Sequence, residues 1–272
     1  YLRSSEFKGS KMTSSEMKAV NIMKTSLYQE FYKFSHKKIT WVAPMLLLGY
    51  MALWIAYPMT RLMTMMTYDS SDAINLIVII VGSTMFSMEF QNNTILTLIY
   101  KSSSKPTVYF NKFITIFVYD VLLHALSLAF TVVIALTIRP VAWMKVYRYN
   151  QPLIINMLST TGIDVLTSVL IISLVFVIST MINSNAVVIT ASMAVVFFGE
   201  AISTDFMNLD SSLAYLFKWN PFNMTLLTLQ YSNYPLYHET TLLTNLQISL
   251  GALAYMLTFL GVGYLIFRKK RF

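Results

Sequence analysis

The sequence predicts an all-α polytopic membrane protein with six transmembrane helices and an N-terminal amphipathic helix in the membrane plane. Of its 272 residues, 56% are hydrophobic and only 12% are charged, whereas soluble domains carry about 25% charge. A helix needs roughly 20 mostly apolar residues to cross the hydrocarbon core. The alternative, a soluble protein with large buried helices, does not account for so many uncharged segments of membrane length. Asp, Glu, Lys and Arg are absent from 39–60, 73–88, 165–199 and 240–267.

The block 165–199 is too long for one span, and the polar triplet 183–185 within it predicts a tight turn between two spans. A further apolar stretch, 113–138, is interrupted only by Asp120 and His124. We therefore expect one transmembrane domain, 24–272, with spans at 39–60, 73–89, 113–138, 157–182, 186–206 and 245–267.

The segment 1–23 has no apolar stretch followed by a cleavage site, and we expect an appended linker or a flexible N-terminus. In 24–38, Leu27, Phe31 and Phe34 recur at i, i+4 and i+7, which predicts one apolar helix face. A basic amphipathic helix of this type lies in the membrane interface; a plain cationic flank to the first span is the alternative. The residues expected largely off the apolar face are Lys24, Glu30, Lys33 and Lys37.

The placement of Lys and Arg predicts orientation, because cytoplasmic loops are enriched in both. An even number of spans with the N-terminus inside leaves both termini in the cytoplasm. The loop 139–156 is the exception, with three cations outside. The eleven inside cations are Lys24, Lys33, Lys37, Lys38, Lys101, Lys105, Lys112, Arg268, Lys269, Lys270 and Arg271, and the five outside are Arg61, Arg139, Lys145, Arg148 and Lys218.

The longest external loop, 207–244, carries several Trp and Tyr residues, which favour the membrane–water interface. Pro221 and Pro235 predict breaks between short interfacial helices within it.

The sequence lacks the motifs of several functional classes. It has no Cys, which excludes disulfides and thiolate metal sites. It also has no Gly-x-x-x-x-Gly-Lys-Ser/Thr, no His-Glu-x-x-His and no Gly-x-Ser-x-Gly. The net charge of +8 comes from cations beside the spans, which indicates topology rather than nucleic-acid binding. We therefore expect no catalytic, metal or cofactor site on this chain and no nucleic-acid partner.

Ionisable residues inside spans are functional candidates, because a charge in lipid is costly. Asp120 and His124 are four apart and share a helix face. They are interpreted as a proton relay or as a pair that fixes helix packing, with Asp120 within reach of interfacial water. Asp164, Glu200 and Asp205 lie toward the outer ends of their spans, where they line an external vestibule or cap helices.

The segment 89–112, which follows the second span, has a distinctive pattern. Glu89 ends the span, and the polar stretch 92–94 can cap a new helix. A short apolar run follows, and then a serine-rich turn with lysines, 101–105. The pattern predicts a brief helix at the membrane face, presented to the cytoplasm.

This segment resembles the ABC-2 family of ABC-transporter permease subunits. Those have a Glu at the end of span two, three variable residues, Gly-Thr, a leucine run, a Ser-x-Pro-Val-Ser-Arg-like turn, and Gly-Lys opening span three. Positions that agree in place or in kind are Glu89, Thr94, Leu96, Leu98, Ile99, Lys105 and Lys112. The departures are Asn93 and Asn111 in place of Gly and Ser102 in place of Pro. Asn is a mild change from Gly, because it tolerates unusual backbone angles.

The resemblance implies that the helix after span two is a coupling helix, which docks onto a separate cytoplasmic ABC ATPase subunit. It also implies two permease subunits, identical or different, in a bacterial plasma membrane, with ATP and Mg bound by the ATPase alone. The positions assigned to docking are Glu89, Asn93, Thr94, Leu98, Tyr100, Lys101 and Lys105, and beside them on the in-plane helix Tyr28, Phe31, Phe34 and Lys37.

The chain is also similar in outline to permeases with which Gram-positive bacteria export or resist antimicrobial peptides, including phenol-soluble modulin exporters. This similarity implies an amphipathic or hydrophobic peptide substrate. Two alternatives are open. A proton-coupled secondary transporter would use Asp120 and His124, although no inverted repeat is evident. An intramembrane enzyme would need a convergent nucleophile, base or metal set, and the sequence offers none.

Overall fold

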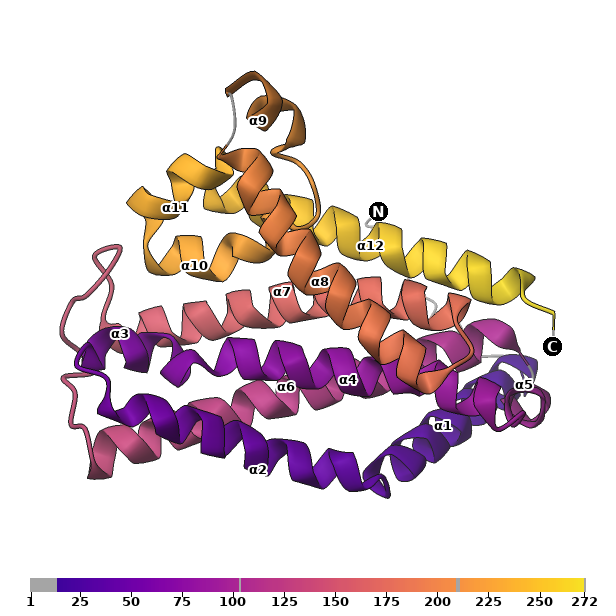
Figure 1. Ribbon diagram of the computed structural model, residues 1–272. Helices are drawn as coiled ribbons and strands as arrows, with labels where there is room; N and C mark the ends of the chain where they lie inside the picture. The colour runs from indigo at the N-terminus through magenta and orange to yellow at the C-terminus, as the bar shows by residue number, and fades with distance from the viewer. Residues whose placement is uncertain (1–13, 103, 209–210, 272) are drawn as a thin grey trace, which may run out of the picture.

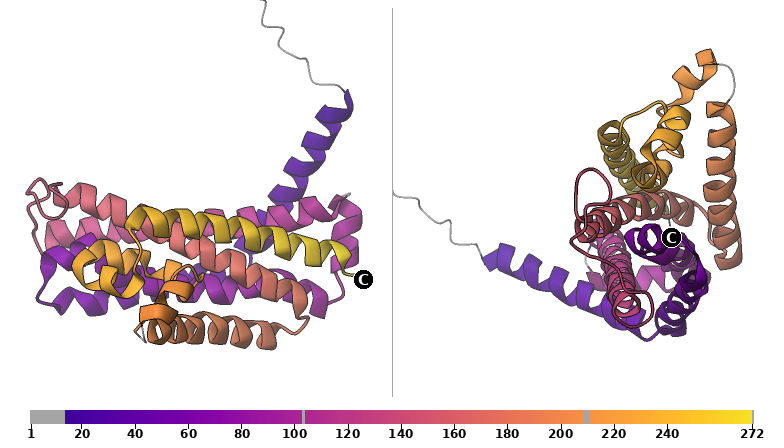
Figure 2. Two further views of the ribbon diagram at one scale, coloured as in Figure 1. Left: turned by 90° about the horizontal axis from the view of Figure 1, so that it is seen from above. Right: turned by 90° about the vertical axis from the view of Figure 1, so that its left-hand side faces the viewer.

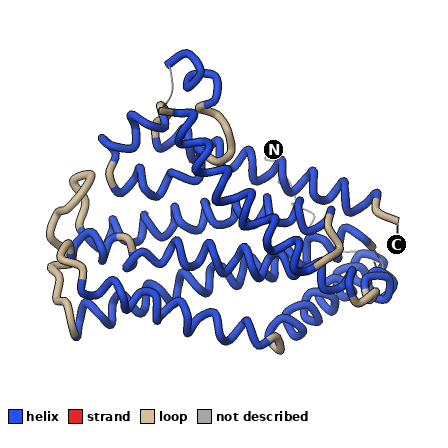
Figure 3. Tube along the Cα trace, viewed as in Figure 1, coloured by secondary structure: helices blue, strands red, loops and turns tan. Residues whose placement is uncertain are grey.

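The computed structural model describes residues 14–102, 104–208 and 211–271, and within them every regular element is a helix (Figures 1 and 3). Six helices are long and apolar enough to cross a membrane. They are α2 (Lys38–Leu53, continued by a 3-10 turn, Trp54–Ala56), α4 (Ser70–Gln91), α6 (Lys105–Thr137), α7 (Leu153–Met181), α8 (Asn185–Met207) and α12 (Asn245–Lys269). The all-helical, six-span fold class predicted from the sequence is confirmed.

Shorter helices lie before and between the spans. They are α1 (Ser14–Ser35), α3 (Thr60–Met65), η2 (Thr67–Asp69), α5 (Ile95–Ser102), α9 (Ser211–Phe217), η3 (Asn223–Leu226), α10 (Leu227–Ser232) and α11 (Tyr234–Thr241). Pro221 separates α9 from η3, as predicted, whereas Pro235 lies in the first turn of α11 and opens that helix. Residues 1–13 lie outside the described part, and α1 begins at Ser14 rather than near position 24.

Several predicted span boundaries differ from the structure, among them the start of the fourth span, which lies at Leu153 rather than at position 157. The first span ends at Ala56 rather than at position 60, because Pro58 follows and the chain turns into α3. The third begins at Lys105 rather than at 113, since Ser104 caps the helix by accepting a hydrogen bond from the Thr107 N–H, with a proline in the first turn. The triplet 183–185 is the predicted tight turn, between the end of α7 and the start of α8.

α4 and α7 form the centre of the bundle. In their most apolar stretches 61% of residues are buried, against 22% in α2, α8 and α12, which lie at the periphery. An aromatic cluster of Phe86, Tyr109, Phe176 and Phe267 ties α4, α6, α7 and α12 together, with the Phe86 ring 5.1 Å from Phe267 and 5.4 Å from Phe176. Packed aromatic pairs of this kind fix the helices where the bundle meets α5.

The bundle has two distinct ends (Figure 1). The α5 end carries α1, α5 and the C-terminus, whereas the opposite, α3 end carries α3 and the α6–α7 loop. α1 crosses the α5 end steeply and projects sideways from the bundle (Figure 2), contacting α6, α5 and α2. This orientation is the one expected of a helix lying in the membrane plane.

Candidate functional site

The turn between α4 and α5 positions the predicted coupling helix. The Thr94 N–H donates to the Glu89 carbonyl at 3.0 Å, and the Asn93 N–H donates to the Phe90 carbonyl at 3.2 Å. This pair of bonds is a Schellman motif, whose penultimate residue takes a left-handed conformation. Asn93 has φ 53°, so the residue that replaces the family's Gly occupies the position where Gly or Asn is favoured. The turn therefore aims α5 away from α4 by standard helix-capping geometry.

A buried ion cluster lies directly beside this turn. The Lys112 Nζ of α6 is 2.8 Å from Glu89 Oε1 of α4 and 3.0 Å from Glu30 Oε2 of α1. The Lys112 residue is 1% exposed and Glu30 is 4% exposed. Lys33 completes the cluster at the surface, with its Nζ 3.6 Å from one carboxylate oxygen of Glu30 and one of Glu89. One buried ammonium thus joins three helices that lie far apart in sequence.

Each charge in the cluster needs the others. Glu89 lies in the last turn of α4, where the helix dipole disfavours a negative charge. An isolated buried ammonium is likewise strongly disfavoured unless it is paired and hydrogen-bonded. Two positions that carry the family resemblance, Glu89 and Lys112, are therefore direct partners.

The structure corrects the expectation that Glu30 lies off the buried face of α1. The apolar spacing of α1 places Glu30 largely off the buried face, yet its side chain points into the bundle because Lys112 is there to receive it. Ser26, one turn earlier, is also buried and accepts a hydrogen bond from Asn111 Nδ2 at 3.1 Å. The available signal was the stripe Ser26, Glu30 and Phe34 at i, i+4 and i+8, opposite two adjacent polar residues of α6.

Lys37 extends the positive side of this cluster. Burial lowers its pKa from the ordinary 10.5 to about 8, with the Lys112 ammonium acting in the same direction. The carboxylates of Glu89 and Glu30 act in the opposite direction and raise the pKa of Lys37. The pKa of Lys37 therefore depends on the charges of Lys112, Glu89 and Glu30 near the junction between α1 and α2.

α5 has one inward and one outward face. Ile95 and Leu98 are buried against the bundle, whereas Leu96 is 55% and Tyr100 89% exposed. The side chain of Lys101 lies outside the described residues. Of the positions assigned to docking, Tyr100 points outward, and Leu98 and Glu89 point inward, where they hold α5 in place.

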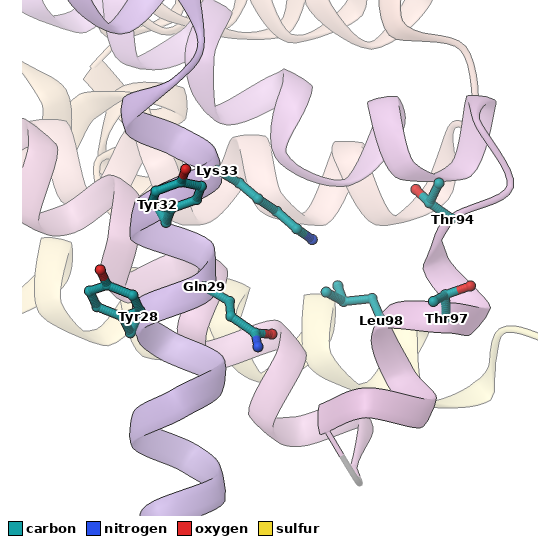
Figure 4. A pocket seen from close by; sticks show the side chains of 7 residues that line it. All are labelled: Tyr28, Gln29, Tyr32, Lys33, Thr94, Thr97 and Leu98. Carbon is teal, nitrogen blue, oxygen red and sulfur yellow. The ribbon is translucent and has the colours of Figure 1, made fainter.

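A groove of about 520 Å³ separates α5 from α1 (Figure 4). Tyr28 and Tyr32 stand on its α1 side and stack with ring centroids 6.5 Å apart; they are 70% and 56% exposed. Phe34 is buried against Tyr119 of α6, and Phe31 is half-buried. The outward tyrosines border the groove on the α1 side, and Thr94, Thr97 and Leu98 border it on the α5 side.

The C-terminal end of α12 also packs at the α5 end of the bundle, where it is bonded to α6. The Lys105 Nζ donates to the Arg268 and Lys270 carbonyls at 3.0 and 2.7 Å. The Lys270 Nζ donates to the Thr180 carbonyl at 3.0 Å and lies 3.9 Å from the ring centroid of Phe90. These bonds satisfy carbonyls at two helix ends and join α6, α7, α12 and α4.

The intramembrane polar residues fall into two buried groups. The Ser168 hydroxyl of α7 donates to Asp120 Oδ2 at 2.8 Å, and His124 Nδ1 lies 3.5 Å from Asp120 Oδ1. Asp120 lies deep in α6, because that helix begins earlier than predicted. Its side chain is fully buried, so the expected access to interfacial water is wrong. The Thr228 hydroxyl of α10 donates to Asp164 Oδ1 at 2.6 Å, which fixes the short helix α10 to α7.

Glu200 lines a large cavity toward the α3 end, whereas Asp205, on the same helix, is exposed. Among the described residues, no group of three or more His, Asp or Glu side chains is arranged to hold a metal ion. At the α5 end, the ion cluster holds the surface helix α1 against the spans α4 and α6.

Six apolar spans with a braced surface helix define a multi-pass membrane protein. A family model described as ABC-2 family transporter protein matches residues 26–199, and the chain belongs to this family. The chain is therefore a membrane permease of an ABC transporter, which works with a partner ABC ATPase. The matched residues run from α1 into α8 and contain the whole ion cluster. No curated protein matches the chain.

Proposed function

We propose that α5, with the adjoining face of α1, is the surface through which the ATPase drives this permease. The observation that carries the proposal is the position of the Lys112 ammonium between Glu89 and Glu30. Because the shared ammonium is buried and bonded to both carboxylates, a displacement of α1 moves α4 and α6 with it. The Schellman turn joins α5 to the same point, so a push on either surface helix reaches two spans.

The outward residues offer the chemistry for docking. Tyr100 and Leu96 project from α5, and Tyr28 and Tyr32 border the groove beside it. Exposed aromatic side chains that can enter a pocket on a partner commonly dominate binding energy. Docking at this end places α1 and the C-terminal end of α12 on the ATPase side, in the cytoplasm, which agrees with the distribution of Lys and Arg.

The transported molecule in this proposal is an amphipathic or hydrophobic peptide, exported across a bacterial cell membrane by two permease subunits, identical or different. The apolar composition, with 18 Met and 18 Phe, supports such a substrate, because Met adapts to varied apolar partners. The pair Asp120–His124 is assigned a packing role, since Ser168 and Asp120 bond α6 to α7.

Co-purification with the ATPase subunit from the same host tests the docking surface. We expect the double variant Leu96→Ser/Tyr100→Ser to lose most of the ATPase, because it removes two outward anchors and leaves the inward face of α5 intact. The matched control is Tyr215→Ser/Leu216→Ser on α9, where the same two residue types are 62% and 73% exposed. Equal recovery of ATPase with both double variants would show that α5 is not the docking helix.

A further inference from the structure

A cavity in the described part of the chain opens toward the α3 end, between α2, α4, α7, α8 and α10. Its volume is about 720 Å³, within the range of small-molecule and cofactor sites, about 300–1,000 Å³. The wall is mainly aliphatic and aromatic, and three of its side chains, Leu46, Leu76 and Phe197, are 40–62% exposed at its margin. Three carboxylates interrupt this apolar wall: Asp69, Asp72 and Glu200.

These carboxylates have no cationic counterpart of their own. In the described ranges, no Lys, Arg or His lies within ion-pair distance of Asp69, Asp72 or Glu200. The Tyr50 hydroxyl donates to Asp69 Oδ2 at 2.8 Å. Asn75 also lines the cavity, and its side-chain amide oxygen, Oδ1, is buried without a hydrogen-bond partner in the described structure. The charged side chains that line the cavity in the described residues are thus all negative, and they lie beside an unsatisfied acceptor.

Local helix electrostatics account for two of the acids but not the third. Asp69 and Asp72 lie at the N-terminus of α4, where the helix dipole favours negative charge. Glu200 lies in the C-terminal third of α8, where the dipole gives no such benefit. An ionisable residue at such a position in a span is costly and indicates a function that needs a counter-charge. The missing counter-charge points to a cation brought by a ligand.

We propose that this cavity binds the cationic face of an amphipathic peptide, with Glu200 and Asp72 as the groups that select positive charge. The inference rests on the proposed function and narrows its substrate class. Lysine or arginine side chains of the peptide meet the two carboxylates, and its apolar face meets Leu46, Leu76 and Phe197. The volume accommodates a few side chains, so the cavity takes a segment of a peptide rather than a whole helix.

The test uses the full chain in nanodiscs of zwitterionic lipid, without the ATPase. The probe is a synthetic amphipathic leucine–lysine helix that carries a benzophenone side chain; a leucine–glutamate helix of equal length is the comparison. After irradiation, mass spectrometry locates the cross-linked residues. We expect the lysine probe to label α4 and α8 residues of the cavity and the glutamate probe to label them at least tenfold less.

Two variants and one control assign the effect to the cavity. Glu200→Gln and Asp72→Asn should each weaken labelling by the lysine probe about tenfold, the usual size of a lost bond between charged partners. Asp205→Asn removes an exposed carboxylate from the same helix outside the cavity and should leave labelling unchanged. Asp72 is exposed at the margin, so its variant tests the proposal even if Glu200→Gln misfolds.

Equal labelling by the two probes, labelling confined to residues outside the cavity, or an equal loss with Asp205→Asn would each overturn the proposal. Absence of any cross-link in the cavity, as when lipid chains fill it, would do so too. None of these results bears on ATPase docking, which is measured separately by co-purification. The selectivity of the cavity and the permease function therefore fail or stand independently.

Discussion

Among single residues, Lys112 contributes most to holding the α5 end together. Its ammonium is buried and is shared by carboxylates of α1 and α4. Removing this ammonium leaves the two carboxylates with only the half-exposed Lys33, 3.6 Å from each. The loss of one partner of a buried ion pair costs about 3–5 kcal/mol. Exposed pairs are worth much less, about 0–1 kcal/mol. The cluster contains a buried lysine and an exposed one, which gives a matched comparison.

We therefore expect Lys112→Met to lower the stability of the detergent-solubilised chain by about 3–5 kcal/mol and to expose α1 to proteolysis. Lys33→Met, whose side chain is 51% exposed, should cost no more than about 1 kcal/mol. Thermal unfolding and limited proteolysis measure both. Similar effects of the two variants would contradict the buried junction.

Lys37 gives a prediction in terms of pH. Its pKa is lowered to about 8, so it loses its proton in the folded chain well before it does so in the unfolded chain, at 10.5. Between these values the unfolded state binds more protons, and the contribution of Lys37 to stability rises with pH. Titration of a ¹³C-dimethylated Lys37 by NMR measures the midpoint. Glu89→Gln should lower it further, and a midpoint near 10.5 would contradict burial.

Among the elements, the α4–α5 turn is the most sensitive to sequence. Asn93 is left-handed, with φ 53°, whereas the neighbouring Asn92 has φ −91° and needs no special residue. Asn93→Gly should be nearly neutral, and Asn93→Val should destabilise the turn by about 1–2 kcal/mol. Asn92→Val is the control. Hydrogen exchange of the Thr94 amide reports the effect, and equal exchange in the two Val variants would contradict the Schellman geometry.

The elements also show how far sequence reasoning reaches. Apolar blocks of membrane length locate all six spans, five of them free of Asp, Glu, Lys and Arg over most of their length, because a bilayer constrains composition locally. The sequence places the start of α6 too late, because a lysine at position 112 resembles the cationic flank of a span. A buried lysine is tolerated only through Glu30 and Glu89, which come from other helices, and no local pattern reveals such a pairing.

The candidate site was predicted to a similar degree. The sequence pattern of 89–112 located Glu89, the α4–α5 turn and α5, because these lie within one short segment. It did not indicate that Leu98 points inward, nor that Lys105 bonds the carbonyls at the end of α12, 163 residues away. The acidic cavity was anticipated only through Glu200, since its other walls come from four further helices.

In the whole molecule, the two ends of the bundle differ in charge and in packing. The α5 end is charged, braced and presents outward aromatics, whereas the α3 end encloses an acidic, apolar cavity. α4 belongs to both: Glu89 lies in its last turn and Asp72 in its first. A movement imposed at the α5 end can therefore reach the cavity along a single central helix.

Docking of the ATPase on α5 is tested most directly by a single-cysteine cross-link, which is straightforward because the chain has no cysteine. Tyr100→Cys places a thiol on the outward face of α5, and Tyr215→Cys places one on α9 with comparable access. A bifunctional reagent is then applied to membranes that contain the host ATPase subunit. We predict a permease–ATPase adduct with Tyr100→Cys and none with Tyr215→Cys; an adduct with Tyr215→Cys alone, or with neither variant, would contradict docking on α5.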